Sequence, residues 1–282
     1  MPQALAAGAR VVSDVRVEKV LHGGGAVRGV EAVALSAAGR PHRRVRLTAP
    51  LVVLAGSAIG SAALADASGL PDPHGIAGRS LRLHPGAAVA GLFDRDIDAH
   101  KGIPQSYECT EWLSFEEGSD RRVWIVPAFA HPIGAAAMLP GFGAEHMAML
   151  RSYRRMAVFT AMVHDETKGT VRAGRDGRPV VRYRIDEADR AQLALGMGQC
   201  ARLLFAAGAR EVIVPAVPPV RLRSLRELEA QRWDFVGPHG VPMASVHPMG
   251  TLPLGDDPKR SVVSSRGEHH HVRGLFVADG SL

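Results

Sequence analysis

The sequence predicts an α/β fold in which part of a parallel-sheet domain is combined with a second region built around a sheet. Two neighbouring segments carry the prediction. Residues 51–55 (Leu-Val-Val-Leu-Ala) form a short, continuous apolar run, which is typical of a strand buried on both faces of a parallel sheet. Residues 56–60 then provide a glycine turn into an alanine-rich helix that we expect to end at Gly69. Together they form a strand–turn–helix unit of an α/β domain.

Three further strands are expected before this unit. Residues 11–21 alternate apolar and polar side chains, as a strand with one buried face does. Three consecutive glycines, 23–25, allow a tight turn, after which residues 27–33 return as a second strand and residues 43–48 form a third. A β-meander, a buried strand and a glycine turn into a helix form the order found late in a nucleotide-binding α/β domain.

The middle of the chain predicts the second, sheet-based region. From about residue 76 to residue 153 short segments are separated by Pro and Gly, and residues 156–164 look like a strand. An Asp-Gly pair between two β-rich segments predicts a hairpin over residues 170–183. Residues 186–208 carry apolar side chains near helical spacing, so we expect one amphipathic helix that ends at the last glycine of this stretch.

Composition and charge indicate a soluble globular protein without a nucleic-acid-binding surface. Of the 282 residues, 46% are hydrophobic and 22% are charged, which is usual for this class. The net charge is +6, but the arginines are dispersed. The densest group, residues 40–46, has no interleaved aromatic side chains, so we interpret the charge as a solvated surface.

The cysteines favour a reducing, cytoplasmic compartment. Cys109 and Cys200 are far apart and have no metal-ligand spacing, so neither a disulfide framework nor a zinc site is expected. The first ten residues lack a basic region followed by an apolar stretch, and no signal peptide is expected. Two uncharged runs, residues 47–65 and 123–144, are interrupted by proline and glycine, so we expect no transmembrane segment.

The most informative residues lie near the end of the chain. Residues 245–251 read Ser-Val-His-Pro-Met-Gly-Thr, followed by Asp-Pro at 257–258, Ser-Val-Val at 261–263 and Val-Ala-Asp-Gly-Ser at 277–281. In order and spacing these segments resemble the end of the glucose–methanol–choline (GMC) oxidoreductases. Earlier segments resemble the same family, and some of them are similar to its branch that acts on long-chain or otherwise apolar alcohols. They are residues 54–60, 68–70, 78–81 with His84-Pro85, 180–183, Asp189 and 206–209.

The resemblance implies FAD as cofactor and an apolar small-molecule alcohol as substrate. Oxidation of an alcohol removes the hydroxyl proton while hydride leaves the adjacent carbon for flavin N5. Neutral imidazole suits the first task, so His247, which matches the catalytic histidine of the family, is the expected base. The flavin carries the redox chemistry. Asp279 and Gly280 match a segment that contacts the cofactor, and Val17 matches a strand residue whose backbone meets the adenine.

The same resemblance implies an incomplete Rossmann-like FAD-binding domain and a sheet-based α+β substrate domain. Residues 1–75 would form the C-terminal part of the FAD-binding domain and residues 76–245 the substrate-binding domain. Residues 246–282 would return to the FAD-binding domain and carry the catalytic histidine.

Three departures from the family pattern lead us to expect a fragment. No Gly-x-Gly-x-x-Gly motif follows an initial strand, although this motif cradles the pyrophosphate. The second active-site Asn or His that the family places after Asp-Gly-Ser is absent, and residues 252–255 read Leu-Pro-Leu-Gly where relatives often have Cys-Arg-Met-Gly. We therefore expect a truncated product, or one half of a split enzyme that needs an N-terminal partner, inactive by itself.

Other interpretations of these residues are weaker. The chain could be a non-catalytic remnant or partner subunit that binds an apolar ligand. Three consecutive histidines, 269–271, suggest a metal, but neighbours in a regular strand point to alternate faces, so no metal site is expected. Ser57 lacks the surrounding hydrolase elbow, and His84 is expected to be structural. The electron acceptor, oxygen or a quinone-type carrier, stays open.

Overall fold

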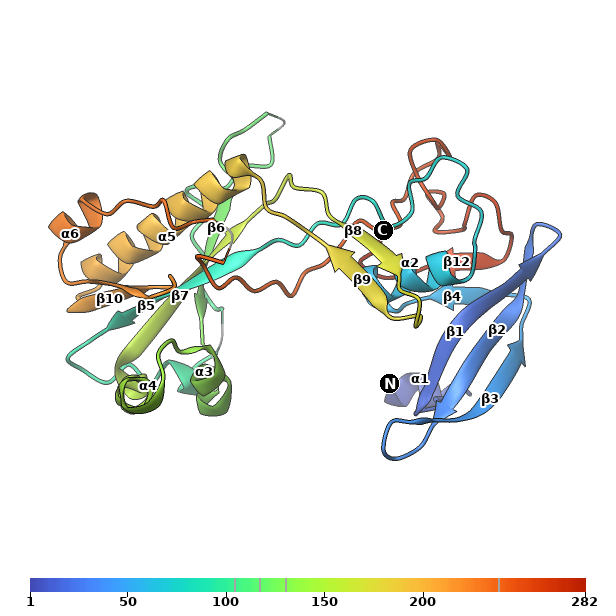
Figure 1. Ribbon diagram of the computed structural model, residues 1–282, viewed down its shortest axis with the longest axis horizontal. Coiled ribbons are helices and arrows are strands. Elements are labelled where there is room, and N and C mark those ends of the chain that lie inside the picture. The colour runs from blue at the N-terminus through green and yellow to red at the C-terminus, as the bar shows by residue number, and fades with distance from the viewer. Residues whose placement is uncertain (104, 117, 130, 238) are drawn as a thin grey trace. The chain divides into compact units, whose positions relative to one another are not determined.

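The chain folds into two compact units, each assembled from segments that are distant in the sequence. The computed structural model describes residues 1–103, 105–116, 118–129, 131–237 and 239–282 (Figure 1). The first unit comprises Met1–Arg82, Lys168–Arg184 and His247–Leu282. The second comprises Leu83–Thr167 and Ile185–Val246. The hairpin over residues 170–183, which we expected in the substrate domain, thus belongs to the first unit.

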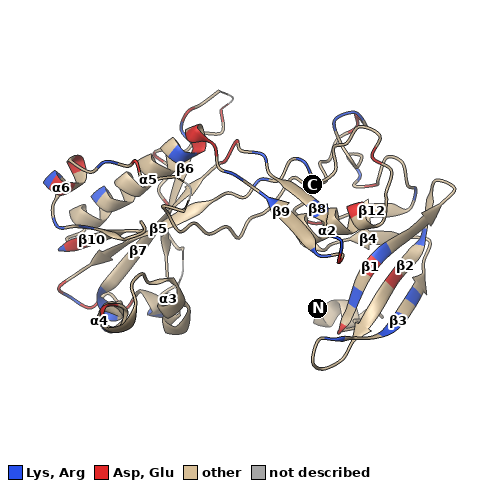
Figure 2. Ribbon diagram, in the orientation of Figure 1, with Lys and Arg blue, Asp and Glu red and all other residues tan. Residues whose placement is uncertain are grey.

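The first unit begins with a three-stranded antiparallel meander, as the sequence predicts. A short helix, α1 (Pro2–Ala6), is followed by β1 (Val15–Gly23), β2 (Ala26–Leu35) and β3 (Pro41–Thr48), paired in that order. Figure 2 shows charged residues of both signs on this meander.

The strand–turn–helix unit follows the meander and pairs with the last strand of the chain. β4 (Val52–Leu54) leads into α2 (Ser57–Ala67), whose alanines at 58, 62, 63 and 65 are buried. β12 (Leu275–Val277) pairs with β4 in parallel, with Phe276 opposite Val53. A two-stranded hairpin, β8 (Thr170–Ala173) and β9 (Pro179–Arg182), packs against α2. The predicted parallel pairing, helix and hairpin are confirmed.

The prediction that residues 51–55 are buried on both faces is wrong. Leu54 is 4% exposed, but Val53 is 56% exposed and Leu51 is 62% exposed. The physical reason is the small size of the sheet, because in the part of the chain that the structure describes β4 pairs with β12 alone. A parallel strand is buried on both faces only where other elements, usually helices, cover both faces of its sheet.

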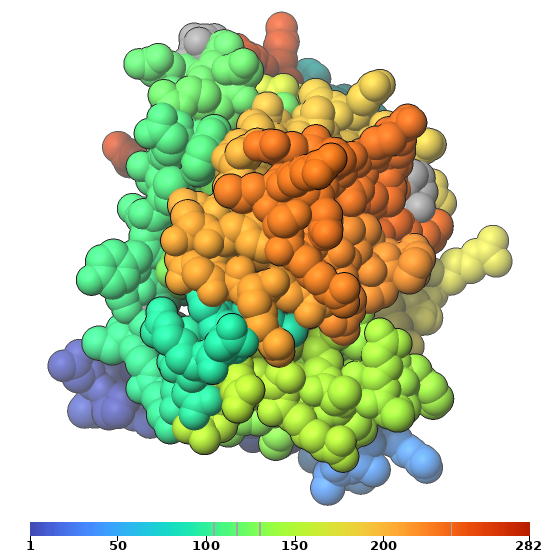
Figure 3. All heavy atoms as spheres, turned by 90° about the vertical axis from the view of Figure 1, so that its left-hand side faces the viewer, coloured from blue at the N-terminus to red at the C-terminus, as the bar shows by residue number. Residues whose placement is uncertain are grey.

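The second unit is an antiparallel five-stranded sheet covered by one long helix. Its strand order is β11-β10-β5-β7-β6, and α5 (Glu187–Ala206) packs on β5, β6, β7 and β10. Figure 3 shows the face where α5 and α6 lie side by side. The predicted helix is confirmed, with Asp186 as its N-cap. The remaining elements are β5 (Gly86–Leu92), η1 (Ala99–Lys101), β6 (Val123–Ala128), α3 (Pro132–Met138), α4 (Gly143–Arg151), η2 (Tyr153–Arg155), β7 (Met156–Val163), β10 (Glu211–Val214), β11 (Val220–Leu222) and α6 (Leu225–Glu229).

A buried ion pair fastens α5 to the sheet of the second unit. The Asp189 carboxylate, which is fully buried, accepts from Nη1 of Arg122 at 2.5 Å and from the amide and hydroxyl of Thr167 at 2.8 and 2.6 Å. Burial alone would raise the pKa of Asp189, but the hydrogen bonds from Thr167, Glu166 and Arg122 bring it below its ordinary value. Asp189 therefore acts as a structural anchor.

No helix in the described ranges is both long and apolar enough to cross a bilayer.

Candidate active site

The loop that carries His247 is held by backbone hydrogen bonds to two other segments of the first unit. Met249 and Arg82 exchange a pair of backbone bonds of 2.9 Å, which form an isolated antiparallel bridge. The Gly250 amide donates to the carbonyl of Gly280 at 2.9 Å, and the Ser80 hydroxyl donates to the Gly250 carbonyl at 2.6 Å. The loop is therefore fixed at its base on both sides.

Thr251 connects this loop to helix α2. Its side chain is fully buried and donates to the carbonyl of Ala58, in the first turn of α2, at 2.6 Å. Its own carbonyl accepts from the Gly78 amide at 2.7 Å, and the next residue, Leu252, donates its amide to Ser281 at 2.7 Å. The threonine of the motif thus has a structural role, because it sets the distance between the His247 loop and the start of α2.

His247 itself is exposed, two residues before the anchored Met249. Pro248 follows it, and a residue before proline is confined mostly to extended conformations. The backbone of His247 is therefore restricted and lies next to an anchored segment, and its exposed imidazole is accessible to a ligand.

Asp279 and Gly280 lie at the carboxyl end of β12, next to the same loop. Oδ2 of Asp279 accepts from the hydroxyl of Ser61 at 2.5 Å, and Oδ1 accepts from the Ser281 amide at 2.8 Å. A Cβ atom on Gly280 would lie 3.1 Å from the carbonyl oxygen of Pro248, so a larger residue would crowd the loop. The structure brings both predicted residues to the His247 loop.

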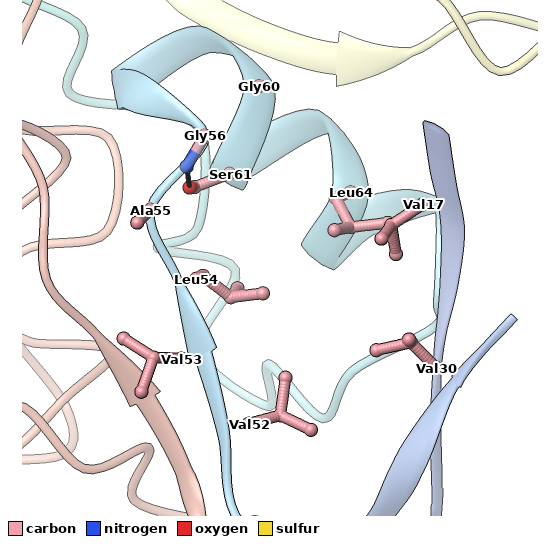
Figure 4. Close-up of a pocket in the computed structure, with 10 residues that line it drawn as sticks. All are labelled: Val17, Val30, Val52, Val53, Leu54, Ala55, Gly56, Gly60, Ser61 and Leu64. Atoms are coloured by element: carbon pink, nitrogen blue, oxygen red, sulfur yellow. Dashed lines mark hydrogen bonds between the residues drawn. The ribbon is translucent and has the colours of Figure 1, made fainter. Parts of the chain in front are cut away.

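Val17 lies beside a hollow of about 200 Å³ between β1, β2, β4 and α2 (Figure 4). The side chains of Val30, Val52 and Leu64 line it, and Gly56 and Ser61 are at its end near α2. The Gly56 amide donates to Ser61 Oγ at 2.9 Å, the bond drawn in Figure 4. Since Ser61 lines the hollow and also binds Asp279, the hollow extends to the segment that holds the His247 loop.

The histidines outside this site have structural contacts. The ring of His84 stacks on Trp124 with the centroids 6.0 Å apart, and its amide donates to Asp165 at 3.0 Å. His270 Nε2 lies 3.0 Å from Ser261 Oγ. Burial, together with charge on His271 and His270, lowers the pKa of His269 to about 4. Across the described ranges, no group of three or more His, Cys, Asp or Glu has the arrangement of a metal site.

Sequence reasoning missed Ser61. It is 1% exposed and bridges the Gly56 amide and the Asp279 carboxylate, so it links the turn after β4 to the segment after β12. A serine in an alanine-rich helix carries no signal of this role, because its partner is distant in the sequence.

Comparisons with known proteins agree with this architecture. Two family models described as GMC oxidoreductase match the chain, the N-terminal one over residues 1–86 and the C-terminal one over residues 165–282. An uncharacterized GMC-type oxidoreductase of Mycobacterium tuberculosis is 39% identical over 286 residues, which cover 100% of this chain and 43% of the relative. A long-chain-alcohol oxidase of Arabidopsis thaliana is 26% identical over 89% of this chain and 34% of its own length. The chain thus spans less than half the length of these relatives.

Solved structures show the same fold. A formate oxidase has a TM-score of 0.61 at 13% identity and covers 95% of this chain with 55% of its own. An FAD-dependent oxidoreductase from Chaetomium thermophilum has a TM-score of 0.58 at 16% identity, covering 97% of this chain and 57% of its own. The match to the N-terminal family model counts against the prediction that the chain is a fragment lacking that domain. The chain belongs to the GMC oxidoreductase family, and its cofactor is FAD.

Proposed function

We propose that this chain takes part in the oxidation of an alcohol to an aldehyde or ketone, with His247 as the base that accepts the hydroxyl proton. The observation that carries the proposal is the anchored loop. It carries the exposed His247 a few residues before Gly250, which binds Gly280, and Thr251, which binds the first turn of α2. Imidazole is the side chain best suited to accept a proton near neutral pH, and positioned proton transfer contributes about 10²–10⁴-fold to rate.

The residues of the first unit fit FAD. The hollow beside Val17 has apolar walls and no acidic side chain among its lining residues, which suits a flat aromatic group. At its end near α2, Gly56 has no side chain to prevent close approach of a ligand to the backbone. Asp279 accepts hydrogen bonds from Ser61 and Ser281, and the bond from Ser61 holds the segment after β12 against α2. When bound, FAD supplies the hydride acceptor. In this proposal Val17 contacts the adenine and residues 279–280 contact the flavin side.

For the substrate, we propose a long-chain or otherwise apolar alcohol. The support is the likeness to long-chain-alcohol oxidases of Arabidopsis thaliana, at 26% identity over 89% of this chain for one of them.

We also propose a cytoplasmic location, which suits Cys109 and Cys200 as free thiols.

Residues 1–282 alone are proposed to be inactive, because their relatives devote more than half of their length to polypeptide outside the matched region. The competing function is non-catalytic binding of an apolar ligand. It predicts alcohol binding without any change in the flavin spectrum.

The experiment is anaerobic flavin bleaching by a long-chain primary alcohol, measured on a flavin-loaded assembly that contains this chain. His247→Ala should slow bleaching about 10²–10⁴-fold while leaving the flavin content unchanged. His84→Ala is the matched control, since that ring stacks on Trp124 in the second unit. Bleaching by the His247 variant at the parental rate would show that another group takes the proton.

A further inference from the structure

A buried carboxylate of the second unit holds the backbone of residues 83–84. Asp165 comes shortly after the end of β7 and is only 4% exposed. Its Oδ2 accepts from the Leu83 amide at 2.9 Å, and its Oδ1 accepts from the His84 amide at 3.0 Å. Successive amides in a turn can converge on one anion, and hydrogen bonds to a carboxylate are about twice as strong as neutral ones. One side chain therefore fixes two adjacent residues of the backbone.

The backbone of His84 has a conformation that needs such support. Its φ is +53°, in the left-handed region that residues with a Cβ atom rarely occupy. Pro85 follows it, and a residue before proline normally prefers an extended conformation. Unfavourable backbone geometry persists only where the surrounding structure determines it, and it occurs often at functional sites. The bonds to the buried carboxylate supply this support.

The held backbone pairs in turn with the segment that leads to His247. Gly86 and Ala244 exchange two backbone hydrogen bonds, of 2.9 and 3.0 Å. The Ser245 hydroxyl donates to the carbonyl of Leu83, whose amide is one of the two that the buried carboxylate accepts from. His247 comes two residues after this serine. Hydrogen bonds therefore connect the carboxylate to a point two residues before the imidazole.

The chain is thus held on both sides of His247. Two residues after it, Met249 is paired with Arg82 in the first unit. Two residues before it, Ser245 is bonded to Leu83 in the second unit. Loss of the support before His247 would leave its backbone fixed on one side alone, so the imidazole could take more directions.

We propose that Asp165 is a positioning residue for His247. By holding the turn at residues 83–84 it fixes Ser245, and Ser245 limits the directions that the imidazole can take. The inference rests on the proposed role of His247 as the base. Asp165 acts through the backbone and moves no proton in the reaction. A displacement of about 1 Å at a reacting group can cost about 10²-fold in rate, so an indirect support of this kind can affect the reaction.

Backbone amide exchange of the full chain, measured by NMR, tests the structural step without flavin or alcohol. Asp165→Asn keeps the shape of the side chain but replaces one acceptor oxygen by an amide group that only donates. The Ala244 amide should then exchange about tenfold faster than in the parent, over and above any increase at the amides of β7.

Gly196→Ala is the matched control for this measurement. A Cβ atom there would lie 2.7 Å from Ala161 and Val123, so the variant disturbs the packing of α5 on the same sheet and leaves the turn at residues 83–84 in place. In this variant, exchange at Ala244 should rise no more than exchange at the amides of β7.

The second measurement is anaerobic bleaching of the flavin-loaded assembly over a range of pH. Asp165→Asn should lower the limiting rate about tenfold and leave the flavin content and the half-saturating alcohol concentration unchanged. The midpoint of the pH profile should also stay unchanged, because a direct effect of the lost charge on the imidazole would shift that midpoint.

Ser245 provides a second pair of variants on the same series of bonds. Ser245→Ala should slow bleaching about as much as Asp165→Asn, whereas Ser245→Thr, which keeps the hydroxyl, should bleach like the parent. The double variant Asp165→Asn/Ser245→Ala should be no slower than either single variant, because both substitutions remove the same support. Independent effects that multiply in the double variant would contradict a single series of bonds.

Three results would overturn the inference and leave the role of His247 intact. They are parental bleaching by Asp165→Asn while His247→Ala is slow, a shifted pH midpoint without a lower limiting rate, and exchange at Ala244 that only follows β7. Parental bleaching by His247→Ala would instead overturn the proposed function, and with it any role of Asp165 in the reaction. Faster exchange at Ala244 in Asp165→Asn would still show that this carboxylate supports the loop.

Discussion

The hydroxyl of Ser61 donates a 2.5 Å hydrogen bond to the carboxylate of Asp279, which is 218 residues further along the chain. Ser61 is in the first turns of α2, and Asp279 follows β12, so the bond joins α2 to the segment after β12 at the carboxyl end of the parallel pair. The same hydroxyl accepts from the Gly56 amide. One buried side chain therefore fixes the turn after each of the two strands.

Ser61→Ala should destabilise the first unit by about 1–3 kcal/mol, because the Gly56 amide and one Asp279 oxygen lose a buried partner. The measurement is the urea dependence of unfolding. Ser36→Ala is the control, since the Ser36 hydroxyl accepts a hydrogen bond from the Arg40 amide at an exposed turn, and its effect should stay below about 0.5 kcal/mol. Equal effects of the two substitutions would mean that the bond between α2 and β12 contributes nothing to stability.

Alanine substitutions at two glycines of α5 should change the stability of the chain in opposite directions. A Cβ atom on Gly196 would lie 2.7 Å from the Cβ of Ala161 and from Cγ1 of Val123, whereas one on Gly198 would lie 3.4 Å from the Trp233 ring. Gly196→Ala should therefore separate the helix from the sheet and cost about 1–3 kcal/mol. Gly198→Ala should stabilise by up to about 1 kcal/mol, because alanine favours the helix. Thermal unfolding of the two variants checks the sign of each effect, and a stabilising Gly196→Ala would contradict the close packing.

Local patterns predicted most secondary structure, because strand alternation, the Asp-Gly turn and helical spacing are properties of neighbouring residues. The hairpin over residues 170–183 and the helix α5 illustrate this. The burial of residues 51–55 was predicted wrongly, because burial depends on the elements that cover the two faces of the strand and not on the run itself. The motif at 245–251 identified His247, but the anchoring of its loop depends on Arg82, Gly280 and α2.

The site residues likewise divide into those that a sequence motif reveals and those that only a tertiary contact defines. Asp279 and Gly280 could be found from their motif, since the residues are adjacent and their order is distinctive. Ser61 could not, because its function follows from a tertiary contact with one carboxylate. Assignment of residues 168–184 to the first unit likewise results from packing of β8 and β9 on α2, which no local pattern encodes.

The depressed pKa of His269 predicts that the folded chain loses stability in mild acid. Burial, aided by His271 and His270, lowers its pKa from 6.5 to about 4, so the folded chain favours the neutral ring. For a histidine with a depressed folded pKa, the unfolded chain binds the proton more tightly. Stability is therefore fully present above about pH 6.5 and is lost progressively as the pH falls towards 4. A shift of this size corresponds to about 1–3 kcal/mol.

The expected result is a fall in the free energy of unfolding of the parent chain between pH 6.5 and pH 4, which His269→Gln should largely remove. His42→Gln provides the comparison, because His42 is exposed on β3 and should leave the profile unchanged. His269→Gln removes the Nδ1 atom that accepts from the His271 amide, and it lies close to the Ser264–Gly267 turn. The amide signals of β12 are therefore followed to verify that the variant folds. If the profile of His269→Gln falls as steeply as that of the parent, another group is responsible for the loss of stability in acid.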